Sequence, residues 1–206
     1  MIQIKNREGN ILLEVNAENL RGADLKGADL TGAYLEIVDL YFANLRGVNL
    51  SMSALSGANL KCAYLSGANF EGADLLGTNL SNADLRMANL TDVNLSGADL
   101  RRANLSGANL TGAYLGCANF EGADLSNAKL SGAKLKCADL QNANLWLSNL
   151  SGANLQDAIL GAVNLNDANL QDAILNGANL QDANLNGANL AGVKIKGIKV
   201  SDKTKF

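Results

Sequence analysis

The stretch ANLSGANLTGAYL at residues 103–115 contains the five-residue unit that decides the fold of this chain. In both directions from this stretch, a large apolar residue occupies every multiple of five from Leu20 to Val200, which makes thirty-seven positions. Thirty-three of them are Leu, and the exceptions are Phe70, Phe120, Ile195 and Val200. A fixed period of this kind indicates a stack of equivalent structural units.

The residue two places before each large apolar residue is small or β-branched, and Ala occupies twenty-seven of these thirty-six positions. Residues i and i−2 share one face of an extended chain, so both are predicted to point inward, with the Asn or Asp between them pointing outward. A helix would carry successive Leu residues around its cylinder, and a flat sheet needs an even repeat. We therefore expect three extended residues followed by a turn. The expected core includes Leu25, Leu45, Phe70, Leu110, Phe120 and Leu145.

The turn has its own signal two places after each large apolar residue. Eighteen of these thirty-six positions are Gly, three are Asn and five are Asp, which are residue types that accept a positive φ. The remaining ten, such as Ile37, Phe42, Met52 and Cys137, predict a different local turn geometry.

These units resemble a known protein family. Ala23-Asp24-Leu25-Lys26-Gly27, Ala108-Asn109-Leu110-Thr111-Gly112 and Ala183-Asn184-Leu185-Asn186-Gly187 are similar to the A-(D/N)-L-x-x motif of pentapeptide-repeat proteins, and such units fill roughly nine-tenths of the chain. The resemblance implies an all-β fold: a right-handed, parallel, quadrilateral β-helix with four units per coil. Thirty-seven units would then form about nine four-sided coils.

The two ends depart from the repeat. Residues 1–17 contain two short apolar runs around a polar loop, which predicts a β-hairpin that caps the rod. The β-helix itself is expected at 18–200. Residues 201–206 are expected to form a frayed C-terminal tail.

Composition narrows the possible functions. The chain has no His, which removes the usual nucleophilic triads and most zinc sites, and its abundant Gly is explained by the turns. We expect no enzyme activity, no cofactor and no metal. A net charge of −3 argues against direct binding of nucleic acid. The lack of a leader or a long apolar run predicts a cytoplasmic protein that does not enter a membrane.

Exposed apolar residues are the main candidates for a protein-contact patch. The candidates are Ile37, Tyr41, Phe42, Met52, Trp146 and Leu147. The alternative is that large side chains only cover turns that lack Gly. Two rows of basic residues, Arg21 with Lys61 and Arg101, and Lys26 with Arg46 and Arg86, would face either an acidic partner or solvent within a mixed-charge surface.

Cys117 and Cys137 are twenty residues apart and would stack on adjacent coils if four units make a coil. Two interpretations remain open for them, as fillers of neighbouring turns or as a redox or metal site.

The leading hypothesis is a non-enzymatic interaction or scaffold protein that binds an unknown protein partner through the outer faces of a rigid rod. It would be a monomer or an end-to-end dimer. The family resemblance implies an alternative, a DNA-mimicking modulator of a type II topoisomerase. Such mimics are strongly acidic and dimerise through an apolar C-terminal segment, whereas this chain is weakly charged and rich in Lys at its C-terminus.

Overall fold

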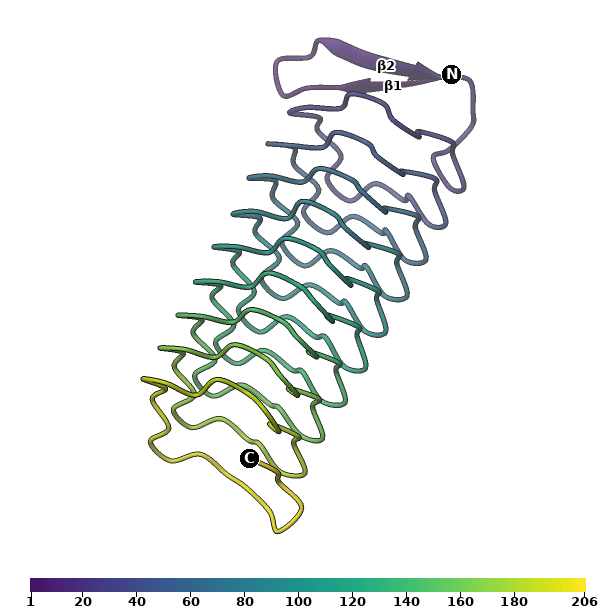
Figure 1. The fold of residues 1–206 in the computed structure, drawn as a ribbon. Coiled ribbons are helices and arrows are strands. Elements are labelled where there is room, and N and C mark those ends of the chain that lie inside the picture. Colours follow the sequence, from purple (N-terminus) through teal and green to yellow (C-terminus); the bar gives the residue numbers. More distant parts are fainter.

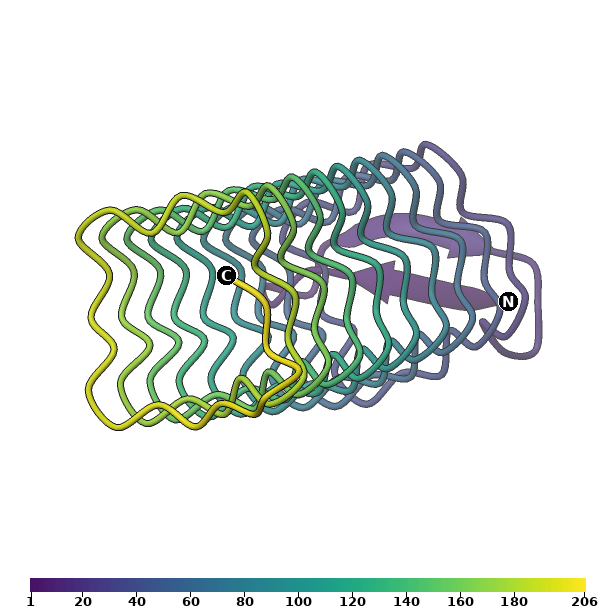
Figure 2. The ribbon, with the colours of Figure 1, turned by 60° about the horizontal axis from the view of Figure 1, so that its bottom comes forward.

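The computed structural model describes residues 1–206 and shows an all-β rod (Figure 1). Its regular strands are β1 (Ile2–Lys5) and β2 (Ile11–Val15), which pair antiparallel at one end. The rest of the chain forms stacked turns, each aligned with the next along the rod (Figure 2). No helix in the structure is long and apolar enough to cross a membrane.

The register between turns is constant along most of the rod. Parallel bridges join residues twenty positions apart, from Asp24 with Asn44 to Asn179 with Lys199. Twenty residues are four five-residue units, so one turn of the rod takes four units. Each unit bonds in both directions: Leu110 N donates to Lys129 O (2.6 Å), and Asn109 N donates to Ala88 O (2.9 Å). These bonds satisfy the backbone polar groups that the closely stacked turns remove from water.

The core is a column of Leu and Ala that runs through the rod. The six residues expected in the core are at most 3% exposed, and they belong to one cluster of sixty-two buried apolar residues: Leu25, Leu45, Phe70, Leu110, Phe120 and Leu145. Alternation along each three-residue extended segment places Ala and Leu inside and the intervening Asn or Asp outside, as the sequence predicts.

The turns correct one prediction. Residues such as Ile37, Phe42, Met52 and Cys137 were expected to give a different turn geometry, but their φ values of 57–59° fall in the same left-handed region as the Gly turns. The hydrogen bonds between turns impose one backbone path on every unit. A side chain at this position therefore accepts the conformational cost that Gly avoids.

The N-terminal hairpin closes one end of the core. Ile4 of β1 is buried in the core of the rod. The backbone of β1 also continues the hydrogen-bond ladder of the rod, because Tyr34 N donates to Lys5 O (2.8 Å). Arg7 of the hairpin loop also forms an exposed ion pair with Glu36 (3.7 Å).

The opposite end differs from the tail expected at 201–206. Lys205 pairs with Asn184, and Leu185 N donates to Lys205 O (2.8 Å), so these residues remain on the rod. The offset there is 21 residues instead of 20, because one extra residue is accommodated in the turn. Three inward positions of the last turn are exposed, since no further turn of the structure packs on them: Leu190, Ile195 and Val200.

Candidate interaction surface

Three aromatic rings meet on one side of the rod near its N-terminal end. The ring centroids of Phe42 and Tyr64 are 5.1 Å apart in an edge-to-face arrangement, and those of Tyr41 and Phe42 are 6.2 Å apart. Phe42 is 50% exposed. Tyr41 and Phe42 are consecutive, whereas Tyr64 comes from the next turn, so the group depends on the stacking of the coils.

Two arginines cover the flanking tyrosines. The guanidinium carbon of Arg21 lies 4.8 Å from the Tyr41 ring centroid, and that of Arg46 lies 4.3 Å from the Tyr64 centroid. Such cation–π contacts hold both the ring and the planar cation in place. Arg21 also donates to Asp39 Oδ2 (2.7 Å), which fixes its orientation. We call Arg21, Tyr41, Phe42, Arg46 and Tyr64 the aromatic patch.

The structure separates the six residues of the expected contact patch. Ile37 is 83% exposed and lies a quarter of a turn before Phe42 on the same coil. Met52 is exposed but comes ten residues after Phe42, which is half a turn away. Trp146 follows Arg46 by 100 residues, or five turns of twenty, and Leu147 is its neighbour. Only Tyr41 and Phe42 therefore belong to the aromatic patch.

The sequence placed Arg21 and Arg46 in the basic rows, but Tyr64 and the stacking of these arginines on tyrosines were missed, because sequence distance hides such contacts. Tyr64 occupies an outward position that is mostly Asn or Asp elsewhere, and that substitution is the signal that could have revealed it. Its contact with Phe42, twenty-two residues away, becomes visible only with the 20-residue register.

The basic rows are interleaved with carboxylates. Arg86 donates from Nε and Nη2 to the two carboxylate oxygens of Asp84 (2.7 and 2.8 Å), and Arg101 does the same with Asp99 (2.8 and 2.7 Å). Hydrogen bonds from Arg86 lower the pKa of Asp84, and those from Arg101 lower the pKa of Asp99, although partial desolvation of each carboxyl opposes the shift. This part of the surface is a mixed-charge face in which several Arg are already paired.

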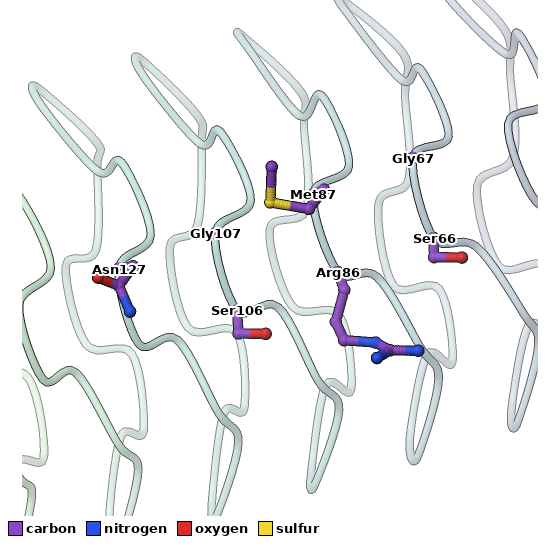
Figure 3. Close-up of a pocket in the computed structure, with 7 residues that line it drawn as sticks. All are labelled: Ser66, Gly67, Arg86, Met87, Ser106, Gly107 and Asn127. Carbon is purple, nitrogen blue, oxygen red and sulfur yellow. The ribbon is translucent and has the colours of Figure 1, made fainter.

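A shallow trough of about 690 Å³ lies beside this face and spans several turns (Figure 3). Met87 leans over Gly107, while the guanidinium of Arg86 points the other way (Figure 3). Ser66 and Ser106 also line the trough, but the only titratable group that accompanies them is Arg86. The lining therefore offers no general base to activate either hydroxyl.

Cys117 and Cys137 occupy the same corner on adjacent turns, and all three cysteines are free. Desolvation is the largest cause that raises the pKa of the Cys137 thiol, and the neighbouring Cys117 and Asp157 raise it further. No three His, Cys, Asp or Glu side chains in the structure lie close enough together to hold a metal ion.

Comparison with known proteins identifies the repeat. A family model described as pentapeptide repeats matches eight copies, covering residues 19–51, 53–86, 88–127, 103–137, 128–167 and 164–202. No curated protein matches the chain.

Among solved structures, the chain is similar to HetL, a pentapeptide repeat protein involved in heterocyst differentiation regulation from the cyanobacterium Nostoc sp. strain PCC 7120. The identity is 34% over 89% of this chain and 90% of HetL, with a TM-score of 0.33. It is also similar to Rfr23 from the cyanobacterium Cyanothece 51142 (38% identity, 52% of this chain and 63% of Rfr23, TM-score 0.32). A trypsin-treated form of QnrB1, a plasmid-mediated fluoroquinolone resistance protein, is 23% identical over 88% of this chain and 91% of its own, with a TM-score of 0.40. Because the repeat model matches nearly all of residues 19–202, the chain belongs to the pentapeptide repeat family.

Proposed function

We propose that this protein binds another protein through the aromatic patch and acts as a non-enzymatic interaction or scaffold protein. The observation that carries the proposal is the exposed Phe42 ring, held between two tyrosines that are each covered by an arginine. Tyr and Arg are among the residues that contribute most to binding at protein interfaces. Because their mutual contacts already order these side chains, they would lose little conformational entropy when a partner binds.

The rod presents this patch on a rigid support. We infer about nine four-sided coils, wound right-handed as the family resemblance implies, with the patch near the capped end. A cytoplasmic setting agrees with three cysteines that remain unpaired, because disulfides are rare in reducing compartments.

The alternative function, in which the rod imitates DNA and modulates a type II topoisomerase, has less support in the surface. DNA carries a regular row of negative charge, whereas carboxylates on this face alternate with Arg, as Asp84 does with Arg86. Residues 141–192 carry four Asp and no cation, which is a weak imitation of a phosphate backbone. A supercoiling assay with micromolar protein tests this alternative, and we expect no effect.

The test of the proposed function uses a double variant that should keep the fold. Phe42→Gly suits the φ of 58° at this turn, and Tyr64→Asn restores a residue common at outward positions. A matched control, Met87→Gly with Tyr114→Asn, makes the same two kinds of change away from the patch, where Met87 has the same φ.

Chemical crosslinking followed by affinity capture would compare wild type, the patch variant and the control. We expect a specific partner to be retained by wild type and the control, and lost by the patch variant. Equal recovery of that partner by all three proteins would remove the aromatic patch as its binding site.

A further inference from the structure

One corner of the rod carries side chains where other corners often carry Gly. Hydrogen bonds join this corner from turn to turn: Phe42 N to Lys61 O, Cys62 N to Ser81 O, Asn82 N to Arg101 O and Arg102 N to Glu121 O (2.9–3.0 Å). Phe42, Cys62, Asn82 and Arg102 are four consecutive non-glycine residues at this position, all with φ of 56–58°. We call this row the Phe42 corner.

The left-handed residues are unevenly distributed among the four corners. Eighteen non-glycine residues have a positive φ in the whole rod. Seven of them share the Phe42 corner, twenty residues apart except where Gly122 stands between Arg102 and Asn142, and the other three corners share the remaining eleven. The seven are Phe42, Cys62, Asn82, Arg102, Asn142, Ala162 and Asp182. A left-handed backbone costs an ordinary residue about 1–2 kcal/mol, which Gly does not incur. Asn and Asp tolerate this backbone, but Phe42, Cys62 and Arg102 do not, so the Phe42 corner keeps side chains that the turn itself does not need.

A polar hollow of about 270 Å³ lies on this corner, on the side of the aromatic patch away from the hairpin. It is lined entirely by polar residues: Lys61, Ser81, Asn82, Arg101, Arg102 and Glu121. The hollow forms because Ser81 and Asn82 are short, whereas Lys61 on the preceding turn and Arg101 and Arg102 on the next are long. Phe42 N donates to the backbone of Lys61, so the hollow begins one turn after the aromatic patch.

The hollow has cations that remain available. Arg101 is engaged by Asp99, but Lys61 and Arg102 take part in none of the four ion pairs of the structure. Glu121 also lines the hollow and takes part in none of these ion pairs. The hollow can therefore accept an added carboxylate, which would bring two cations and two anions together.

We propose that the Phe42 corner binds an extended acidic segment of a protein partner, with an apolar side chain on Phe42 and a carboxylate between Lys61 and Arg102. This second proposal rests on the proposed function and specifies the kind of protein segment that the partner would present. Lys61 is one turn and Arg102 three turns from Phe42, so a carboxylate between them lies about two turns away, or about 10 Å at ~4.8 Å per stacked strand. An extended peptide covers this distance in about three residues at ~3.3 Å each. An aromatic residue followed three places later by Glu fits this spacing.

The same face disfavours a nucleic acid. Three carboxylates lie among the arginines of this face: Asp39, Asp84 and Asp99. They would repel the continuous row of phosphates of a nucleic acid. A protein segment can place single carboxylates only where the free cations are. This difference in charge spacing decides in favour of an acidic peptide.

The direct test measures binding of a fluorescein-labelled peptide, Phe-Ser-Ser-Glu-Glu, by fluorescence anisotropy at low salt. The companion peptide Phe-Ser-Ser-Gln-Gln keeps its length and aromatic residue but has no carboxylate side chain. We expect the Gln peptide to bind about tenfold more weakly, and we expect salt to weaken the acidic peptide, because exposed charge pairs are screened.

The variant for the hollow is Lys61→Gln with Arg102→Gln. We expect it to lose about five- to tenfold in affinity for the acidic peptide, because two exposed charges contribute modestly to binding. Lys129→Gln with Lys134→Gln removes two exposed cations elsewhere on the rod and should leave the affinity unchanged. Thermal melts of both variants check that the fold is intact.

Three results with the peptides would overturn the proposal: no binding of the acidic peptide at millimolar concentration, equal binding of the Gln peptide, or wild-type affinity in the hollow variant. Tighter binding of a single-stranded oligothymidylate than of the peptide would also overturn it, in favour of nucleic acid.

The failure of this proposal is distinguishable from failure of the proposed function. A protein partner that is lost with Phe42→Gly and Tyr64→Asn, but retained with Lys61→Gln and Arg102→Gln, would leave the aromatic patch as an interaction site and reject the acidic segment. A partner lost in neither variant would reject both.

Discussion

The carboxylate of Asp92 lies over Gly112, which occupies the same corner one turn further along the rod. A Cβ on Gly112 would collide with Asp92 Oδ1, and the φ of 71° at this position already disfavours a side chain. The same relationship recurs between Asp157 and Gly177, and between Asp172 and Gly192. A side chain on one turn thus limits which residue can occupy the next.

Gly112→Ala is therefore expected to destabilise the rod for two reasons. The left-handed backbone costs about 1–2 kcal/mol, and displacing the Asp92 carboxylate adds about 1 kcal/mol of rotamer strain. Chemical denaturation measures the loss. Gly132→Ala is the matched control, because its φ is 67° and no atom lies within 4 Å of the place that its new methyl group would take. Equal losses at the two sites, or no rescue of Gly112→Ala by Asp92→Gly, would contradict the collision.

Ala108→Leu tests the tight packing of the small inward residues. Ala108 is fully buried, and three added carbon atoms cannot be accommodated beside the Leu column without moving the backbone. We expect a loss of about 3 kcal/mol or more, or failure to fold, measured by a thermal melt. Ala191→Leu places the same side chain at an exposed position and should melt near wild type. A wild-type melt for Ala108→Leu would refute the inward placement of Ala108.

Ser148→Ala should stabilise the protein. Ser148 is buried and its Oγ has no hydrogen-bond partner, so the change removes a desolvated hydroxyl. Relief of an unsatisfied buried polar group is worth about 1–3 kcal/mol. Ser53→Ala is the comparison, because Ser53 Oγ donates to Leu50 O, and its loss should bring less gain. The denaturant midpoints of the two variants and of wild type test this prediction. A Ser148→Ala variant less stable than wild type would contradict it.

Acid should weaken the protein through Asp84 and Asp99. Their folded-state pKa values lie below the ordinary 3.8, since each carboxylate accepts hydrogen bonds from an arginine. As pH falls below about 4, the unfolded chain binds these protons first, and stability is lost as the pH falls through the lower folded pKa values. Urea unfolding between pH 7 and pH 2 should therefore show that the free energy of unfolding falls less with acid in the double variant Asp84→Asn with Asp99→Asn than in wild type. Asp202→Asn, which removes a carboxylate outside the ion pairs, should follow wild type.

The thiol of Cys137 should react slowly at neutral pH. Desolvation and the adjacent Cys117 raise its pKa above the ordinary 9.0, which lowers the fraction of reactive thiolate. With Cys62 replaced by Ser, the pH dependence of iodoacetamide labelling at Cys137, followed by mass spectrometry, should have its midpoint above 9.0. Replacing Cys117 as well should move that midpoint downward. A midpoint that stays in place would show that Cys117 does not influence the thiol.

Local sequence determined the basic unit of this fold. The alternation of Ala, Asn and Leu in a segment such as Ala108-Asn109-Leu110 fixes which side chains face inward, because neighbours in an extended chain point to opposite sides. The following Gly112 indicates a left-handed turn for the same local reason. The hairpin is likewise visible in two apolar runs around a polar loop.

Tertiary structure decided which distant residues meet. A period of five does not state how many units close a turn, and the hydrogen bonds between turns set that number at four. This register brings Phe42 against Tyr64, and it places Lys61 and Arg102 around one hollow. The same bonds hold Phe42 and Ile37 at a φ that their side chains disfavour, since breaking the ladder would cost more than the strain. The sequence by itself therefore determined the inward and outward faces of each unit, whereas the candidate binding surface exists only because the turns stack in register.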